Sequence, residues 1–508
     1  MSVSETLHGF PGGLTLPHHK QISLEVPLQR CPLPQRVYVP IAGHETRLLV
    51  SPGDEVLRGQ VLTGTNNDFQ VGAHAPCAGM IVDIADHPAI QPNGNPQRCI
   101  EIQCDPNGSI HPVQRLQDWQ DTSPARLVDH LRQMGLAGMG GAMFPTPAKL
   151  RGPWPPIRTL ILNGAECEPW IACDESLMRA RGAEVVIGGL ILAHAAGADA
   201  IVIAVEDPMA QTSEALKEAV HGLGVSDRIS VVNVPSVYPQ GGERQLIQCL
   251  TGLEVPHDGL PQDIGLLCHN VATAAAAFDA VELGKPVTER VVTVTGPGIN
   301  RPGNFIVAIG TPAQWLIRQA GGYSESANRL IIGGPMSGIA VESDEFVITK
   351  GTNCLLALEV PPRDPEKVMP CINCGACVAT CPASLMPQTL FRFIEAGHYE
   401  QSRKLGVFEC IECGCCAQVC PSHLPLVDFY RHAKAQLRQL DMDHRRASLA
   451  KRRHEARQTR LSEEQAAREA RRLARAEKLR EKKVAKDEIE AAIARARQKK
   501  RSSRENPG

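Results

Sequence analysis

Eight of the eighteen cysteines in this chain fall into two runs that share one spacing. The first run is Cys371-Ile-Asn-Cys374-Gly-Ala-Cys377-Val-Ala-Thr-Cys381-Pro382, and the second, from Cys410 to Pro421, repeats its C-x2-C-x2-C-x3-C-P pattern. Three thiolates at this spacing can bind one cubane cluster, while the fourth, one turn further along, reaches a second cluster. The pattern therefore predicts two 4Fe-4S clusters, one on Cys371, Cys374, Cys377 and Cys420 and the other on Cys410, Cys413, Cys416 and Cys381.

The alternative for these runs is a pair of zinc sites. Structural zinc sites use two separated pairs of ligands, usually with a long gap between the pairs, and a duplicated run of four followed by proline does not have that form. Cys415 is out of register and is predicted not to be a ligand. The other cysteines are scattered singly and are expected to be buried thiols, among them Cys31, Cys77, Cys99, Cys104, Cys249, Cys268 and Cys354.

The glycine-rich stretch Leu136-Ala-Gly138-Met-Gly140-Gly141-Ala-Met-Phe144-Pro-Thr-Pro-Ala-Lys149 is the second segment whose residue types suggest chemistry. Glycines let the backbone approach a phosphate closely, and a lysine a few residues further on supplies the countercharge. The spacing matches neither a Walker loop nor a dinucleotide-binding fingerprint. From these residues alone, a flexible turn before Pro145 is an equally good interpretation.

Short strands and turns are predicted between residues 36 and 102. This pattern resembles the barrel-sandwich fold of biotinyl and lipoyl carrier domains. A carrier needs a lysine for its swinging arm, and no lysine occurs between Lys20 and Lys149. The segment is therefore expected to be structural or to serve in docking.

From Arg158 to Val234 the chain alternates strand and helix, which predicts a parallel, doubly wound sheet. Residues 290–322 then give a strand, a Pro/Gly turn, a second strand and a helix, a pattern that resembles a soluble-ligand-binding β-grasp module. The segment Leu330–Met336 returns to a strand pattern. The apolar window Val185–Val205 contains His194, Asp199 and several glycines, and it is predicted to be a helix followed by a strand rather than a membrane span.

A length of 508 residues predicts several domains. Net charge is near zero, but residues 431–508 hold 25 Lys+Arg against 12 Asp+Glu, which leaves 28 against 43 for residues 1–430. Beyond Leu440 the sequence is low-complexity and either helical or disordered. We expect a multidomain α/β protein with five parts: a barrel-sandwich domain (1–120), an α/β flavoprotein-like domain (121–289), a β-grasp module (290–355), an α-helical two-cluster ferredoxin domain (362–432) and a basic tail (440–508).

The N-terminal residues Met1–His8 lack a basic region followed by an apolar stretch, so no signal peptide is expected. A chain that stays in the cytosol would use its cysteines for metals rather than for disulfides. His8, His18 and His19 are expected to be loop residues rather than a metal cluster. The basic tail lacks the interleaved aromatic residues of single-strand binders, so no nucleic-acid partner is expected.

The glycine-rich stretch resembles the FMN and NADH loop of the flavoprotein subunit of respiratory complex I. Three later segments recur in the same order: Asn163-Gly-Ala-Glu166-Cys-Glu168-Pro169, Tyr238-Pro-Gln-Gly241-Gly-Glu243 and His269-Asn270-Val-Ala-Thr273. By this resemblance, flavin-binding roles fall on Gly138, Gly140, Lys149, Asn163, Asn270 and Thr273, and roles near the nicotinamide nucleotide fall on Phe144, Glu168 and Glu243. Gly141, Glu166 and Gly241, in the same segments, are further candidate cofactor-binding residues.

Two positions depart from that family. Met139 stands where the complex I subunit has arginine, and Ala165 stands where it has aspartate. The resemblance therefore implies a flavin site with looser binding or with different contacts.

The order of the parts, with the strings Tyr238–Glu243 and Gly333-Gly-Pro-Met-Ser-Gly338, resembles the C subunit of the bacterial Rnf (or Rsx) electron-transport complexes. The family implies a peripheral subunit on the cytoplasmic face of the inner membrane. It would pass electrons between NADH and ferredoxin, with ion movement coupled through integral-membrane and other subunits. Chemically, NADH gives two electrons as a hydride and each cluster accepts one, so a flavin between them is a natural converter.

Two other functions fit the sequence. One is a soluble diaphorase subunit of a hydrogenase or formate dehydrogenase, against which the missing complex-I-type cluster motif counts. The other is a non-catalytic ferredoxin-type adaptor whose flavoprotein-like core has lost its cofactor, which the departures at Met139 and Ala165 would accommodate. The flavin content of the anaerobically purified protein separates these possibilities.

Overall fold

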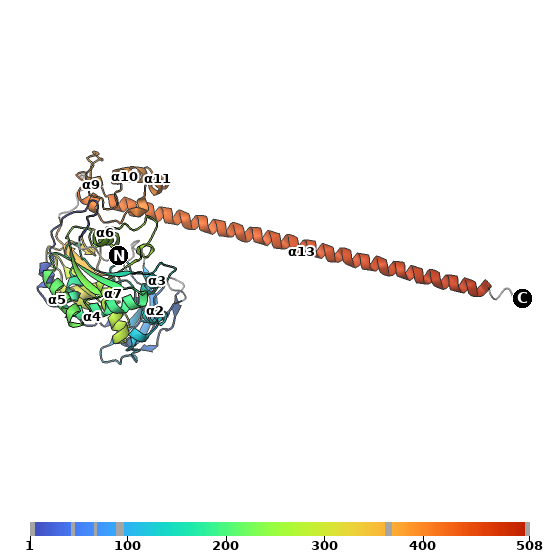
Figure 1. Ribbon diagram of the computed structural model, residues 1–508, viewed down its shortest axis with the longest axis horizontal. Helices are drawn as coiled ribbons and strands as arrows, with labels where there is room; N and C mark the ends of the chain where they lie inside the picture. The colour runs from blue at the N-terminus through green and yellow to red at the C-terminus, as the bar shows by residue number, and fades with distance from the viewer. Residues whose placement is uncertain (1–5, 42–45, 66–68, 88–95, 361–367, 503–508) are drawn as a thin grey trace. The chain divides into compact units, whose positions relative to one another are not determined.

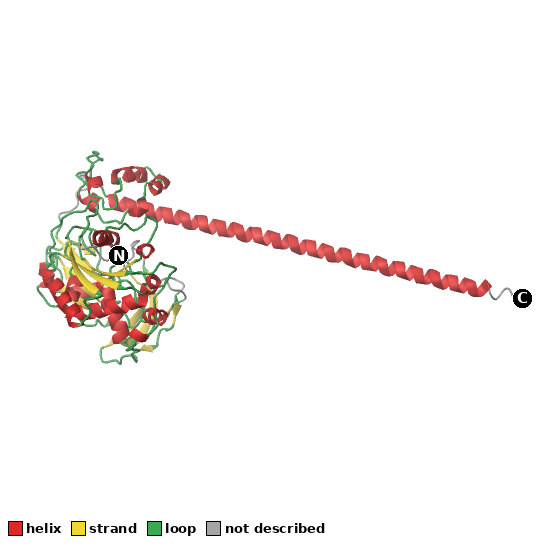
Figure 2. Cartoon of the chain, viewed as in Figure 1, coloured by secondary structure: helices red, strands yellow, loops and turns green. Residues whose placement is uncertain are grey.

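The computed structural model describes residues 6–41, 46–65, 69–87, 96–360 and 368–502 (Figure 1). It divides into two compact units, residues 1–431 and 432–508, which are described separately below. Residues 1–5, on which the expectation about a signal peptide partly rests, lie outside the described residues. Figure 2 shows that strands and helices are interleaved through the first unit.

The first sheet is antiparallel and has the strand order β2-β7-β6-β4. Inward-facing residues alternate along its strands, so that Val37, Val39, Ile100 and Ile102 form a small core of their own with Leu62. Two further strands of two residues each, β3 and β5, occur between β2 and β6 in the sequence and pair with each other. The bounds are β2 Arg36–Pro40, β3 Arg47–Leu48, β4 Glu55–Val56, β5 Thr63–Gly64, β6 Ala78–His87 and β7 Gln97–Asp105.

The second sheet has four parallel strands in the order β10-β9-β8-β11. Its strands read as continuous apolar runs because helices cover both faces. Leu160 and Leu162 of β8 pack on the side of α4, α5 and α7, whereas Ile161 packs with α6 on the other side. The bounds are β8 Thr159–Gly164, α4 Cys173–Ala196, β9 Ala200–Glu206, α5 Ala210–Gly222, β10 Ile229–Val234, α6 Glu243–Thr251, β11 Leu266–Asn270 and α7 Val271–Glu282.

Helices α4 and α7 approach each other closely at a glycine. A Cβ at Gly188 would collide with the backbone carbonyl of Ala274. This contact explains why an otherwise helical apolar segment carries glycine at that position. The apolar window from residue 185 to 205 is thus the second half of α4 followed by β9, as predicted. Short elements precede this sheet: α1 Gln21–Leu24, η1 Trp119–Asp121, α2 Pro124–Gln133 and α3 Thr146–Leu150; η2 Pro261–Ile264 lies before β11.

The third sheet has six strands in the order β1-β13-β12-β16-β14-β15. Strand β14, which contains Leu330, belongs to this sheet rather than to the parallel one, and it pairs antiparallel with β16. Strand β1 comes from the N-terminal segment and pairs parallel with β13. The bounds are β1 Gln29–Arg30, β12 Glu289–Thr295, β13 Gly303–Ala308, α8 Ala313–Gln319, β14 Arg329–Ile332, β15 Ile339–Val341 and β16 Cys354–Leu358.

The cysteine-rich part consists of short helices joined by turns. Its elements are α9 Ala376–Ala379, α10 Pro387–Glu395, α11 Tyr399–Lys404, η4 Val407–Glu409 and α12 Cys415–Gln418. The last helix, α13, runs from Leu426 to Ser502. The basic tail is therefore helical, which settles the alternative that the sequence left open, and residues 442–501 are all exposed. Among the described residues, no helix combines the length and the apolar composition needed to cross a membrane.

Candidate functional site

Two asparagines mark the carboxyl ends of the neighbouring parallel strands β8 and β11, where Asn163 and Asn270 are register partners. Asn163 Nδ2 donates to the carbonyl of Gly241 (2.8 Å). Asn270 Oδ1 caps α7 by accepting from the N–H of Ala272 (2.8 Å), and its Nδ2 donates to Asp174 (2.6 Å). The carboxyl ends of parallel strands are where open α/β sheets bind ligands, so the fold brings the predicted residues to the expected edge.

The glycine-rich loop lies against the first turn of α7. The backbone N–H of Met139 donates to Thr273 Oγ1 (3.0 Å), and the N–H of Gly138 donates to the carbonyl of Phe144 (2.8 Å). Gly140 approaches Asn270 so closely that a Cβ would lie 3.2 Å from the Asn270 Cβ. Gly141 has a φ of 104°, and no atom lies within 4 Å of where its Cβ would be. The loop thus offers open backbone beside a helix N-terminus, which fits a phosphate-bearing ligand.

Lys149 and Glu243 form an ion pair, with Lys149 Nζ 2.7 Å from Glu243 Oε1. Lys149 also donates to the carbonyl of Cys268 (3.1 Å). The resemblance to the complex I subunit assigned the two side chains to different ligands, Lys149 to flavin and Glu243 to the nucleotide, whereas the structure pairs them with each other. A phosphate that binds Lys149 would therefore share the ammonium group with the Glu243 carboxylate.

The other two residues expected near the nucleotide have different surroundings. Phe144 is exposed and lies edge-on to Phe69, with 6.4 Å between ring centroids. The Glu168 carboxylate instead accepts hydrogen bonds from the N–H of Ser337 (2.7 Å), the Ser337 hydroxyl and the N–H of Met336 (3.3 Å). In the part of the chain that the structure describes, no hydrogen bond or ion pair links Glu168 to Lys149 or Glu243.

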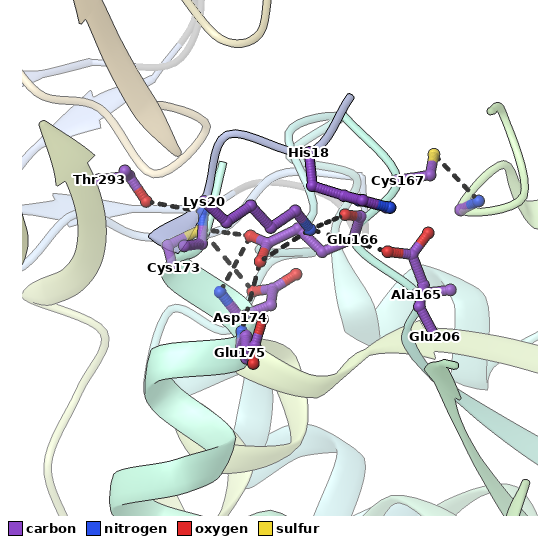
Figure 3. Close-up of polar contacts among 12 residues, drawn as sticks. His18, Lys20, Ala165, Glu166, Cys167, Cys173, Asp174, Glu175, Glu206 and Thr293 are labelled. Carbon is purple, nitrogen blue, oxygen red and sulfur yellow. Dashed lines mark hydrogen bonds and ion pairs between the residues drawn. The ribbon is translucent and has the colours of Figure 1, made fainter. Parts of the chain in front are cut away.

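A buried lysine that the sequence did not indicate, Lys20, lies beside Glu166 and Glu206 (Figure 3). Lys20 is 6% exposed, donates to the backbone carbonyl of Glu166, and lies 3.9 Å from the Glu166 carboxylate and 3.7 Å from that of Glu206. Burial acts to lower the pKa of Lys20, but the carboxylates of Glu166 and Glu206 raise it above its ordinary value. Lys20 therefore stays charged and compensates a buried acidic cluster.

Glu166, a predicted cofactor-binding residue, is itself buried and caps a helix. Its carboxylate accepts from the N–H groups of Asp174 (3.0 Å) and Glu175 (3.4 Å) at the start of α4 and from the Cys173 thiol (3.3 Å). Burial raises the pKa of Glu166 to about 7, although Lys20 opposes the shift. The side chain is thus engaged within the protein, where it joins Lys20 to α4.

Arg290, in β12, is the second residue that sequence reasoning missed. It is 4% exposed, and its Nη2 donates to the carbonyl of Met139 in the glycine-rich loop (3.2 Å), while another guanidinium nitrogen donates to the carbonyl of Lys350. Burial lowers the pKa of Arg290. A guanidinium therefore contacts the loop at Met139, the position where the resemblance to the complex I subunit implies an arginine. The sequence features that could have indicated these two residues are the charge of Arg290 within an apolar strand and the isolation of Lys20 as a lysine early in the chain.

The early histidines lie in loops, as expected. His18 Nε2 is 3.3 Å from the Ser236 hydroxyl, and His19 stacks on Trp170 with 4.5 Å between ring centroids. Of the thiols expected to be buried, Cys31, Cys77, Cys99, Cys249, Cys268 and Cys354 are buried, whereas Cys104 is only partly buried.

The cysteine runs repeat in three dimensions as well as in sequence. The helix-capping glycines Gly375 and Gly414 share the same backbone angles, φ 80° and ψ −8°, and Asn373 and Glu412, two residues before them, both have positive φ. Cys371, Cys374, Cys377 and Cys420 line one small cavity. Burial raises the pKa of the Cys416 thiol, and the nearby thiols of Cys410, Cys413, Cys381 and Cys377 raise it further. The first predicted set, three cysteines from one run and the fourth from the other, is thus brought together, whereas the assignment of the second set stays a prediction.

Cys415 is fully buried at the start of α12. Its assignment as a non-ligand stays a prediction. The donor sets of four thiols fit iron–sulfur clusters, because soft thiolates in groups of four are the ligands that such clusters require.

Direct contacts join the cysteine-rich part to the segment after β10, to the N-terminal segment and to the loop between β14 and β15. The Tyr238 hydroxyl donates to the carbonyl of Cys413 (2.7 Å), and the N–H of Gly13 donates to the carbonyl of Thr380 (3.0 Å). Arg431 bonds both Glu412 (3.0 Å) and the carbonyl of Ser337 (3.1 Å), and Ser337 is the residue that binds Glu168. The second cysteine run is therefore fixed against the edge where the candidate flavin residues lie.

Four family models match the chain. They are the RnfC barrel sandwich hybrid domain at residues 8–107, the Nuo51 FMN-binding domain at 131–279, the SLBB domain at 291–340 and a 4Fe-4S dicluster domain at 370–424. Together with the sheets described above, these matches confirm the expected fold class. The domain boundaries expected from the sequence stay predictions.

Curated relatives share a name that designates each of them as the C subunit of an ion-translocating oxidoreductase complex. The chain is 45% identical to the Edwardsiella ictaluri protein over 478 residues (92% of this chain, 58% of the relative) and 42% identical to the Pseudomonas aeruginosa protein over 474 residues (92% and 60%). It is 41% identical to a Yersinia pestis protein over 492 residues (96% and 78%). The chain thus spans less than two thirds of the first two relatives.

Among solved structures, an NAD+-reducing [NiFe]-hydrogenase in the air-oxidized state aligns at 17% identity with a TM-score of 0.44, over 65% of this chain and 70% of that chain. These values are too low to support an inference about function.

Proposed function

The chain belongs to the family formed by the C subunits of ion-translocating oxidoreductase complexes, and on that premise we propose that it passes electrons between NADH and ferredoxin. In this proposal it is a peripheral subunit on the cytoplasmic face of the bacterial inner membrane, bound to the integral-membrane subunits of an Rnf-type complex. The observation that carries the proposal is the hydrogen bond from Tyr238 to Cys413, because it ties a candidate flavin edge to a candidate cluster ligand.

The flavin part of the proposal rests on the edge formed by β8, β11 and α7. The backbone of Gly138, Gly140 and Gly141 and the N-terminus of α7 would hold the FMN phosphate, with Lys149 as the countercharge. Asn163, Asn270 and Thr273 would fix the loop and the flavin relative to the sheet, through the hydrogen bonds already described. When bound, FMN supplies the conversion between two-electron and one-electron transfer.

The nucleotide part rests on the exposed side of the same loop. Phe144 offers an aromatic face, and the Glu243 carboxylate, which binds Lys149 through Oε1, has a second oxygen that could accept from a nucleotide hydroxyl. Glu168 would contribute indirectly, because its carboxylate binds the backbone N–H groups of Met336 and Ser337 and so fixes that loop. Gly241 and Glu166 would position Asn163 and α4 respectively.

The cluster part assigns Cys371, Cys374, Cys377 and Cys420 to one 4Fe-4S cluster and Cys410, Cys413, Cys416 and Cys381 to the other. The ligand sharing between the two runs keeps the clusters close enough to exchange electrons. Tyr238 and Arg431 would fix the second run against the flavin edge.

The experiment that tests this function separates the two halves. Lys149→Ala should lower the NADH-driven reduction of every acceptor, because it removes the countercharge. Cys374→Ala should spare the reduction of a small artificial acceptor at the flavin and stop the transfer to ferredoxin. Iron, flavin and proteolytic stability are measured alongside, since loss of a ligand can loosen the module. If Cys374→Ala abolishes artificial-acceptor reduction with flavin still bound, the proposal fails.

A second candidate function is the non-catalytic adaptor. The observation that favours it is the ion pair between Lys149 and Glu243, which neutralises the lysine without a ligand. An anaerobically purified protein with both clusters but no flavin, and with no NADH-dependent reduction of any acceptor, would support the adaptor instead.

A further inference from the structure

A cavity of about 540 Å³ lies away from the residues assigned above, where four segments that are distant in sequence meet. Its walls come from the turn at Arg58–Val61 and from His74, both between β4 and β6, from residues 110–115, from residues 133–134 at the end of α2, and from residues 276–289. None of these lining residues is a proposed flavin, nucleotide or cluster residue. The volume lies in the range of small-molecule sites.

Three basic side chains line this cavity: Arg58, Arg115 and Lys285. Within the described ranges, none of the three has a side-chain hydrogen bond or an ion pair. Unpaired cations that converge on a cavity create a positive potential that attracts anions.

The two acidic side chains at the cavity already have partners from outside it. Glu289 pairs with Arg30 (2.6 Å), and Asp279 pairs with Arg181 (2.6 Å). The charges of Arg58 and Lys285 help to lower the pKa of Glu289, but neither side chain, as the described structure places it, forms an ion pair with it. Because both acidic groups are already paired, the net charge at the cavity is positive. Nδ1 of His74, which is 5% exposed, is a further buried polar atom without a hydrogen-bond partner among the described residues.

The rest of the lining is largely apolar. Met134 and Val287 are buried in its wall, whereas Ile110 is 61% exposed and Val113 is 47% exposed. An apolar wall with a few convergent charges is the usual character of a site for an amphiphilic small molecule.

We propose that this cavity binds a small organic anion, a phosphate or carboxylate carried on an apolar body, with Arg58 and Lys285 holding the charged group and Met134, Val287 and Val113 contacting the body. The proposal concerns a site separate from electron transfer. Its failure would leave the proposed function untouched.

The test uses the full chain loaded with flavin and clusters, and phenyl phosphate as the probe. Isothermal titration at low ionic strength should show binding to one site that is weaker for both inorganic phosphate, which lacks the apolar body, and phenol, which lacks the charge. Arg58→Gln and Lys285→Gln should each weaken binding at least about fivefold, a loss of one charge-assisted hydrogen bond. Lys217→Gln, at an exposed lysine of α5, is the matched control and should bind as the wild type does.

Two further arms remove ambiguity. Lys149→Ala, which alters the proposed flavin site, should leave phenyl phosphate affinity unchanged, and Val113→Glu should lower it by placing a negative charge at the rim. The proposal is overturned if phenyl phosphate does not bind, if Arg58→Gln and Lys285→Gln bind it as tightly as Lys217→Gln, or if Lys149→Ala abolishes binding. It is also overturned if only phosphatidylglycerol vesicles, and not phenyl phosphate, bind in an Arg58-dependent manner, since the ligand would then be a lipid surface.

Discussion

The hydroxyl of Tyr238 donates a hydrogen bond to the backbone carbonyl of Cys413 across 2.7 Å, although the two residues are far apart in the chain. Tyr238 is 5% exposed, and burial raises the pKa of its hydroxyl, so the group remains a donor at any working pH. The segment that contains Gly241 and Glu243 is thereby joined to a predicted cluster ligand by one side chain.

Tyr238→Phe should loosen that junction without removing a cofactor ligand. The loss of one buried hydrogen bond costs about 1 kcal/mol, and most of the effect should be local to residues 410–416. We expect faster amide hydrogen exchange in that segment and slower NADH-driven cluster reduction, with artificial-acceptor reduction unchanged. Tyr323→Phe removes the exposed bond to Asp344 and serves as the control. Equal exchange in Tyr238→Phe and wild type would show that the bond does not hold the junction.

Lys20→Met should destabilise the first unit strongly. The substitution leaves Glu166 and Glu206 buried without their cation, and breaking a buried ion pair from one side costs about 3 to 5 kcal/mol. Anaerobic urea unfolding followed by tryptophan fluorescence measures the change. Lys217→Met, which removes an exposed pair with Glu214, should change stability by less than about 1 kcal/mol. A similar small change in both variants would contradict the role assigned to Lys20.

Stability should fall as pH rises from about 5 to 7, because of the carboxyl groups around Lys20. Burial raises the pKa of Glu166 to about 7 and raises those of Asp174 and Glu206. Between the pKa of these carboxyl groups in the unfolded chain and their higher pKa in the folded protein, the folded protein keeps protons that the unfolded chain has released. The resulting stabilisation is complete below the unfolded-state pKa and disappears as pH rises through the folded-state pKa. Glu166→Gln should flatten the dependence of the urea midpoint on pH. An unchanged slope would mean that Glu166 is already ionised at pH 5.

Cys413→Ser and Cys415→Ser should differ in iron content. Only Cys413 lies in the ligand register, so its loss should remove about half of the iron, whereas Cys415→Ser should keep both clusters. Cys415 is fully buried, and serine should cost some stability without costing iron. Iron determination and EPR of the reduced proteins measure the outcome. Equal losses in the two variants would overturn the assignment.

Truncation before Asp441 should leave cluster content and melting temperature unchanged. Residues 442–501 are all exposed and contribute nothing to a core. The excess of basic over acidic residues should instead support a salt-sensitive association with anionic membranes. Co-sedimentation with anionic vesicles at increasing salt compares the full and truncated chains. Iron loss on truncation would mean that the tail supports the cysteine-rich part.

Much of the site could be predicted because its signals are local in the chain. The cysteine register follows from spacing, and the repeat in sequence appears again as matching backbone angles at Gly375 and Gly414. The parallel sheet follows from alternating apolar strands and helices, and this order places Asn163 and Asn270 at one edge. Each of these inferences needs only nearby residues and the rules of strand pairing.

The charged pairings between distant segments could not be predicted from the sequence. Lys20 reaches Glu166 and Glu206 from the N-terminal segment, Arg290 supports Met139 from the third sheet, and Lys149 pairs with Glu243. No periodicity encodes these partners, because an ionic contact depends on where two segments meet after the sheets have packed. Local sequence patterns therefore specify the candidate ligands and the strand order, whereas the packing of the sheets specifies which charged side chains pair around them.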